Sequence, residues 1–179
     1  QRQMCIRDRS QSAQHTERTA SPDTGARSGG CRAPCKVSGF PIIDTNVVVA
    51  GLLTGHADSP VARILDGMLS AAFPFLVSEA LLAEYRAVLL RSKLCTRHGL
   101  SVTEIDIILT DLARHAIVLN PPITVIAPIA PDAGDQFLWN LLAARPDLVL
   151  VTGDKLLLQD GAMLQRIILP QTFLAQSRH

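Results

Sequence analysis

Residues 40–175 consist of short apolar runs that alternate with longer stretches of helical periodicity. Runs rich in branched apolar residues predict five strands, at residues 41–50 (including the turn that ends this segment), 73–77, 116–119, 148–152 and 167–169. Apolar residues three and four positions apart predict helices at residues 60–69, 79–90, 102–115 and 135–142, and a short helical turn after residue 155. The residues after 169 are expected to form a polar, irregular tail.

Several predicted helices begin with residues that favour a helix start. Pro60 stands at a first helical position, and Ser78 is a favourable N-cap. Ser101 and Glu104 form an S-x-x-E capping box. Strands that alternate with helices are typical of βα units joined by right-handed crossovers. We therefore predict an α/β fold of three layers, α/β/α, with a central, mostly parallel sheet of four to five strands.

Residues 1–38 differ from the rest of the chain. They are rich in Arg, Ser, Gln, Gly and Thr and show no periodicity, which predicts a disordered tail. The opening QRQMCIRDRS resembles the translated read-through of a sequencing adapter, so we expect part of this tail to be a sequencing artefact. The folded domain is thus predicted to span residues 40–175.

The composition, with 47% hydrophobic and 18% charged residues, is that of a soluble globular protein. No apolar run approaches the roughly 20 residues that cross a bilayer, so we expect a cytoplasmic protein without a membrane segment. Residues 1–39 hold seven of the 17 Lys and Arg and three of the 16 Asp and Glu, which leaves 10 basic and 13 acidic residues in the remainder. A nucleic acid would therefore have to meet a local basic patch or bound metal ions.

Two aspartates directly follow predicted strands. Asp44 interrupts the apolar segment FPIIDTNVVVAGLL, where a buried carboxylate needs a cation or a metal as its partner. Asp154 follows the strand LVLVT, and Gly153 before it would allow a sharp turn at the carboxyl end of that strand. A simple turn aspartate also explains Asp154, although a second acid at a strand end weakens that explanation.

Two further acids lie on predicted helices. Glu84 lies at the edge of a buried helix face, where an ordinary exposed glutamate paired with Arg86 or Arg91 is the commoner arrangement. Asp135 stands in the first turn of a helix, shortly after Asp132. Helix capping accounts for both aspartates without a function.

The carboxyl ends of parallel strands meet at one edge of a sheet, so these acids can converge although they are far apart in sequence. The four candidates are Asp44, Glu84, Asp135 and Asp154. A cluster of carboxylates raises their pKa values and costs stability unless a cation compensates the charge. Mg²⁺ and Mn²⁺ prefer oxygen ligands, so the pattern predicts a site for one of these ions.

The same four acids stand in segments that resemble the PIN domain, and within it the bacterial toxin components of toxin–antitoxin modules. The resemblance covers residues 42–174 and rests on four motifs in order: IIDTNVVVAGLL with Asp44, SEALLAEYRAVLLRSKL with Glu84, DAGDQFLWNLLAA with Asp135, and LVLVTGDKLLL with Asp154. Asp135 matches the third motif better than Asp132 does. Asn46 and Thr152 match positions that support the acidic site, whereas Ala50 stands where the group often has serine.

The resemblance implies a PIN-like fold and a metal-dependent endoribonuclease. Its catalytic residues, and the ligands of one or two Mg²⁺ or Mn²⁺ ions, would be Asp44, Glu84, Asp135 and Asp154. A water activated by the metal would attack an RNA phosphodiester, while Asn46 and Thr152 orient the acids. An antitoxin protein that covers the acidic groove and a homodimer are also implied.

Five basic residues are candidates for holding the RNA backbone, namely Arg86, Arg91, Lys93, Arg97 and Lys155. Each is also explained as an ordinary solvated surface charge.

Two alternative functions stay open. A haloacid-dehalogenase-like phosphatase also places an aspartate after its first strand, but that family carries D-x-D, and here Asn46 takes the place of the general acid. A degenerate PIN domain would only bind RNA or a protein, and the presence of all four acids argues against it.

Overall fold

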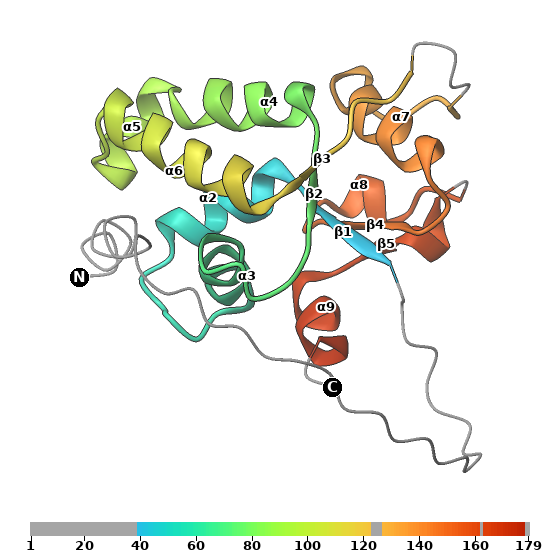
Figure 1. Cartoon of the computed structure of the whole chain (residues 1–179), viewed down its shortest axis with the longest axis horizontal. Helices are drawn as coiled ribbons and strands as arrows, with labels where there is room; N and C mark the ends of the chain where they lie inside the picture. The colour runs from blue at the N-terminus through green and yellow to red at the C-terminus, as the bar shows by residue number, and fades with distance from the viewer. Residues whose placement is uncertain (1–38, 123–126, 162, 178–179) are drawn as a thin grey trace, which may run out of the picture.

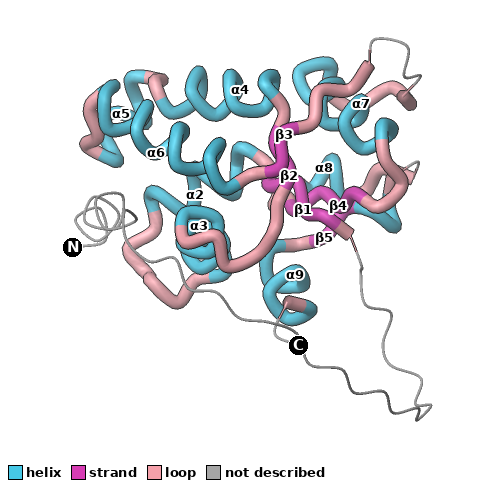
Figure 2. Tube along the Cα trace, viewed as in Figure 1, coloured by secondary structure: helices cyan, strands magenta, loops and turns pink. Residues whose placement is uncertain are grey.

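The computed structural model describes residues 39–122, 127–161 and 163–177; the tail predicted at 1–38 lies outside them. Figure 1 and Figure 2 show the strands gathered at the centre with helices around them. The strands are β1 (Phe40–Ile43), β2 (Leu76–Val77), β3 (Ile117–Val118), β4 (Leu148–Val151) and β5 (Ile167–Ile168). The helices are α2 (Thr45–Leu53), α3 (Pro60–Leu69), α4 (Glu79–Leu89), α5 (Ser92–His98), α6 (Val102–His115), α7 (Gln136–Ala144), α8 (Lys155–Leu158) and α9 (Pro170–Gln176), with short 3-10 helices η1 (Ala133–Asp135) and η2 (Leu164–Arg166).

The five strands form one parallel sheet in the order β3-β2-β1-β4-β5. β1 and β4 pair along their whole length, with Phe40 opposite Leu148 and Ile43 opposite Val151. Their sequences, FPII and LVLV, are almost entirely buried, as expected for central parallel strands that helices cover on both faces. Because β1 and β4 are neighbours, the residues that follow each of them lie side by side at the carboxyl edge of the sheet.

The connections place helices on both faces of the sheet. The chain moves outward from β1 to β2 and β3 through α2 to α6, and then returns through α7 to β4 and through α8 to β5. Right-handed crossovers in opposite directions put these two groups of helices on opposite faces. Figure 1 shows α2 to α6 on one side of the strands and α7 and α8 on the other. The predicted three-layer α/β/α fold with a parallel sheet is confirmed.

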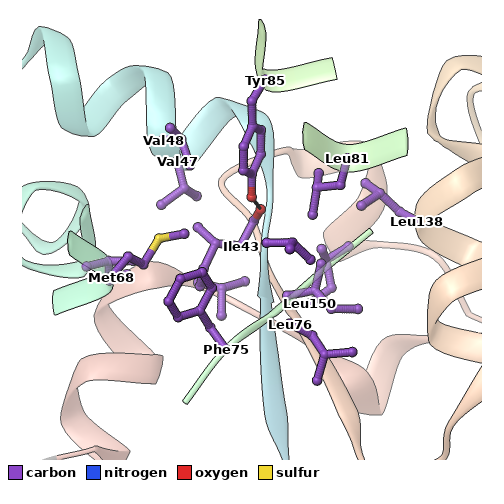
Figure 3. Packing of buried hydrophobic residues seen from close by; sticks show 14 of the residues in the cluster. Ile43, Val47, Val48, Met68, Phe75, Leu76, Leu81, Tyr85, Leu138 and Leu150 are labelled. Atoms are coloured by element: carbon purple, nitrogen blue, oxygen red, sulfur yellow. Dashed lines mark hydrogen bonds between the residues drawn. The ribbon is translucent and has the colours of Figure 1, made fainter. Parts of the chain in front are cut away.

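Tyr85 on α4 connects this helix to the end of β1 (Figure 3). Its ring is fully buried among apolar side chains of the core, and its hydroxyl donates a hydrogen bond to the backbone carbonyl of Ile43. A buried tyrosine needs a partner for its hydroxyl, and this one finds it at the last residue of β1. The contact holds α4 over the residue that precedes Asp44.

The first predicted strand is too long. β1 ends at Ile43, and α2 begins at Thr45, so residues 45–53 are helical and not strand and turn. α2 packs so closely on α3 that a Cβ added to Gly51 would lie 2.8 Å from the carbonyl oxygen of Val61. A short helix that is apolar on most sides has no helical period, and its valines favour a strand.

Besides α2, two more helices are absent from the sequence prediction. α5 follows α4 after two residues and ends at His98, and the C-cap Gly99 has a left-handed φ of 65°. α9 replaces the predicted irregular tail, and its Phe173 ring packs edge-on against Phe73, with 5.1 Å between centroids. Of the helices in the described ranges, none combines the length and the apolar character that a membrane crossing requires.

Candidate functional site

Asp44 lies between the last residue of β1 and the first of α2, and it is only 6% exposed. Its backbone N–H donates to the carbonyl of Val151 at 3.0 Å, which ties it to the end of β4. Its carboxylate Oδ2 accepts hydrogen bonds from Thr152 Oγ1 at 2.6 Å and from Asn46 Nδ2 at 2.7 Å. Burial raises the pKa of Asp44 above its usual value, and the charge of Asp154 adds to this, while the hydrogen bonds act in the opposite direction.

Thr152 and Asn46 join the ends of β1 and β4. The Thr152 hydroxyl donates to Asp44 and accepts from Asn46 Nδ2 at 3.1 Å and from the Asp154 backbone N–H at 3.0 Å. These three bonds use its one donor and both of its lone pairs. The Gly153 N–H, which can only donate, bonds Asn46 Oδ1 at 3.2 Å and so orients the amide with Nδ2 toward Asp44.

Gly153 is not needed for a special backbone conformation. It does not adopt a left-handed φ, and an added Cβ would lie 3.8 Å from Asn46 Oδ1, an ordinary contact. The predicted turn at Gly153 therefore does not use a backbone conformation that only glycine adopts readily. Its contribution to the site is the backbone N–H that orients Asn46.

Asp132 and Asp135 have different surroundings. Asp132 is exposed, and its Oδ1 accepts a hydrogen bond from the Gly134 N–H at 2.8 Å, which caps η1. Asp135 precedes α7, but its side chain makes no capping hydrogen bond. The capping explanation thus holds for Asp132 and is wrong for Asp135, whose carboxylate stays available to the site.

Asp135 is the residue at which the charges of the candidate acids meet. Its pKa is raised to about 6, first by burial and then by the negative charge of neighbouring carboxylates. The neighbours are Asp44, Asp132, Asp154 and Glu84. The fold therefore brings acids that are up to 110 positions apart, from 44 to 154, within electrostatic range of one another.

Glu84 is the one of the four candidates that lies within ion-pair distance of a basic side chain in the described residues. Its side chain is 39% exposed, and Arg91 Nη2 lies 4.0 Å from its Oε1, at the limit of an ion pair. Arg86 instead forms two hydrogen bonds with Asp106 on α6, at 2.8 and 3.2 Å. If Glu84 is an ordinary surface glutamate, as the predicted alternative has it, its ion-pair partner is therefore Arg91, at a long distance, and not Arg86.

The candidate RNA-binding cations are spread over two regions. Arg86 lies in the last turn of α4 and Arg91 is the N-cap of α5, while Lys93 and Arg97 are exposed on α5. Lys155 begins α8, is exposed, and directly follows Asp154. Of the five basic residues, Lys155 is thus the one that is adjacent in sequence to a candidate acid.

The donor set consists of carboxylate, amide and hydroxyl oxygens, which suit Mg²⁺ or Mn²⁺ better than softer metals. Within residues 39–122, 127–161 and 163–177, no Lys or Arg forms an ion pair with Asp44, Asp135 or Asp154. In the same ranges, no three His, Cys, Asp or Glu side chains have the spacing that holds a metal ion. The carboxylates repel one another, which explains why they interact electrostatically but do not converge on one point. A divalent cation would compensate their negative charge.

The raised pKa of Asp135 predicts how the stability of the metal-free protein depends on pH. The aspartate pKa is about 3.9 in an unfolded chain and about 6 in the fold, so the folded state binds the proton more tightly. Its stabilising contribution is complete below about pH 4 and is lost as the pH rises through about 6. We expect a higher melting temperature by calorimetry near pH 5 than near pH 7.5, with a smaller difference in Asp135→Asn. An unchanged difference in that variant would contradict the assignment.

Sequence reasoning missed the hydroxyl of Tyr85. The helical period predicts that Tyr85 is buried, but not that its hydroxyl bonds Ile43 beside the acid site. Burial and the charge of Asp44 both raise the pKa of Tyr85 well above its usual value, which places the phenol close to Asp44. The signal in the sequence is that a buried tyrosine hydroxyl requires an acceptor.

The sequence matches the model of the PIN domain family over residues 41–156, a range that contains all four acids and runs from β1 into α8. Neither the curated proteins nor the solved structures contain a significant match. PIN domains are typically nucleases and generally use divalent metal ions. Because the matched residues make up more than half of the chain, the chain belongs to the PIN domain family.

Proposed function

We propose that this protein is a metal-dependent endoribonuclease that hydrolyses RNA phosphodiester bonds. The observation that carries the proposal is the cluster of acids around Asp135, whose pKa is raised to about 6 first by burial and then by the charges of four other carboxylates. Such a cluster costs stability, and it persists here at the edge of a parallel sheet where ligands bind. A structural role would not require so many acids within electrostatic range of one another.

The four acids Asp44, Glu84, Asp135 and Asp154 would hold one or two Mg²⁺ or Mn²⁺ ions. A bound divalent ion supplies a water of lowered pKa and offsets the charge that develops on the phosphate. Thr152 and Asn46 fix the orientation of the Asp44 carboxylate through hydrogen bonds of 2.6 and 2.7 Å. Lys155, exposed at the start of α8, is suited to contact a neighbouring phosphate.

The alternatives receive less support. The chain belongs to the PIN domain family, and Asn46 stands where a dehalogenase-like phosphatase has its general acid. Neither observation favours such a phosphatase. A degenerate domain that only binds RNA or protein would not need an aspartate at 6% exposure that two side-chain hydrogen bonds hold in place.

A biological role as the toxin of a bacterial toxin–antitoxin module is part of the same proposal. It includes an antitoxin protein that covers the acids, a homodimer and a cytoplasmic location. Light scattering of the purified protein tests the dimer, and a small antitoxin-like reading frame next to the gene would support the module.

The nuclease activity is tested with fluorescent RNA oligonucleotides incubated with Mg²⁺, with Mn²⁺ or with EDTA. We expect cleavage with either metal and none with EDTA. Asp154→Asn should be inactive, whereas Asp106→Asn, which alters an exposed acid paired with Arg86 on the α4–α6 surface, should cleave normally. Cleavage that persists in EDTA, or full activity of Asp154→Asn, would refute the metal mechanism.

A further inference from the structure

A cleft of about 420 Å³ lies at the carboxyl ends of β2 and β3. Its walls include Ser78, Glu79, Asn120, Pro122, Phe137 and Asn140. The first wall is the first turn of α4, the helix that carries Glu84, and the second is α7, which follows Asp135 directly. Since all strands are parallel, this cleft and the residues after β1 and β4 share one edge of the sheet.

One wall of the cleft is held in place by a pair of hydrogen bonds. The backbone N–H of Glu79 donates to Asn120 Oδ1 at 3.1 Å, and Asn120 Nδ2 donates to Glu79 Oε1 at 3.0 Å. These bonds fix the segment after β3 against the start of α4. The cleft is therefore formed by residues with defined positions, as ligand sites usually are.

The opposite wall presents an oriented hydrogen-bond donor. The Ala130 N–H donates to Gln136 Oε1 at 2.9 Å, so Gln136 directs its Nε2 to Asn140 Oδ1 at 3.1 Å. Among the residues that the structure describes, the Nδ2 group of Asn140 has no hydrogen-bond partner, and this chain of bonds orients it as the donor end of the amide. Asn140 therefore offers N–H donors to an occupant of the cleft.

The ring of Phe137 stands beside this donor and is only partly buried. An aromatic face next to an oriented amide suits a flat, polar, uncharged group. The residues that line the cleft include no Lys or Arg, and Glu79 is acidic, so a phosphate is disfavoured. An unstacked nucleobase has the required face and edge, and proteins recognise single-stranded RNA by stacking and by hydrogen bonds to such edges.

We propose that this cleft binds one base of the RNA substrate next to the cleaved phosphate, with Phe137 stacking on the base and Asn140 bonding an acceptor on its edge. The proposal rests on the nuclease function and adds a base preference to it. Ala80, in the wall of the cleft, is four residues before Glu84, about one helical turn or 6 Å along α4. An RNA strand that crosses this edge of the sheet can thus contact both the cleft and Glu84.

The test measures binding of short fluorescent oligoribonucleotides, one for each base, by anisotropy in EDTA, where no cleavage occurs. Phe137→Leu should weaken binding roughly tenfold, and Asn140→Asp, which replaces a donor by an acceptor, should change the order of base preference. Phe73→Leu is the matched control. It removes a partly buried ring from a different cleft, at the amino end of β2, and should bind like the wild type.

Cleavage of random-sequence RNA, read by sequencing, separates this inference from the proposed nuclease. A wild-type protein that cleaves with a base profile unchanged by Phe137→Leu and Asn140→Asp would refute the base site and leave the nuclease. Oligonucleotide binding that depends on Phe137 without any cleavage would support the base site and refute the nuclease. Equal binding by all variants would overturn the inference and favour a protein segment as the occupant.

Discussion

Replacement of Asp44 by asparagine is expected to lower the rate of RNA cleavage at least about a hundredfold without unfolding the protein. The substitution keeps the size of the side chain but removes the charge that would bind the metal. Because burial already raises the pKa of Asp44, a neutral side chain at this position relieves an unfavourable interaction in the metal-free fold. Melting temperature and far-ultraviolet circular dichroism should therefore stay close to those of the wild type.

Asp111→Asn provides the matched control for Asp44→Asn. Asp111 is also mostly buried, with 15% of its side chain exposed, but it lies on α6 and pairs with Arg114 at 3.7 Å. This control should cleave RNA at the wild-type rate. Substantial activity in Asp44→Asn, or equal losses in both variants, would mean that the carboxylate of Asp44 is not part of the chemistry.

Thr152→Val should weaken both the site and the fold. The side chain is fully buried, and valine keeps its shape while it removes the hydroxyl that donates to Asp44 at 2.6 Å. Two donors, Asn46 Nδ2 and the Asp154 N–H, lose an acceptor at the same time. We expect a loss of about 1–3 kcal/mol in the free energy of unfolding and a roughly 10–100-fold loss of cleavage.

Thr152→Ser restores the hydroxyl and should recover most of the activity, because the positioning of Asp44 depends on this oxygen. A serine variant as impaired as the valine variant would show that the methyl group, and not the hydroxyl, matters. The comparison therefore separates a positioning role from simple packing in the core.

Patterns that depend on local sequence were sufficient for much of the fold. The apolar runs before Asp44 and Asp154 predict β1 and β4, and the capping box at Ser101 predicts the start of α6, where both capping hydrogen bonds are present. These signals are local because a strand end or an N-cap is decided by a few adjacent residues. They also determine the sheet edge at which the acids meet.

Elements that depend on contacts across the chain could not be predicted in this way. α2 is apolar on most sides, and its helical form depends on packing against α3 and α4, which are later in the sequence. α9 depends on Phe173, whose ring meets Phe73 one hundred positions earlier. The different surroundings of Asp132 and Asp135 rest on a single hydrogen bond from Gly134, which two aspartates in one motif do not reveal.

The central claim is that the acids around Asp135 form a site for a divalent cation, and calorimetric titration of Mn²⁺ into the metal-free protein tests it most directly. We predict saturable binding of one or two ions per chain, weakened at least about tenfold in Asp154→Asn and unchanged in Asp106→Asn. Absence of saturable Mn²⁺ binding by the wild type, or equal affinity in Asp154→Asn, would contradict it.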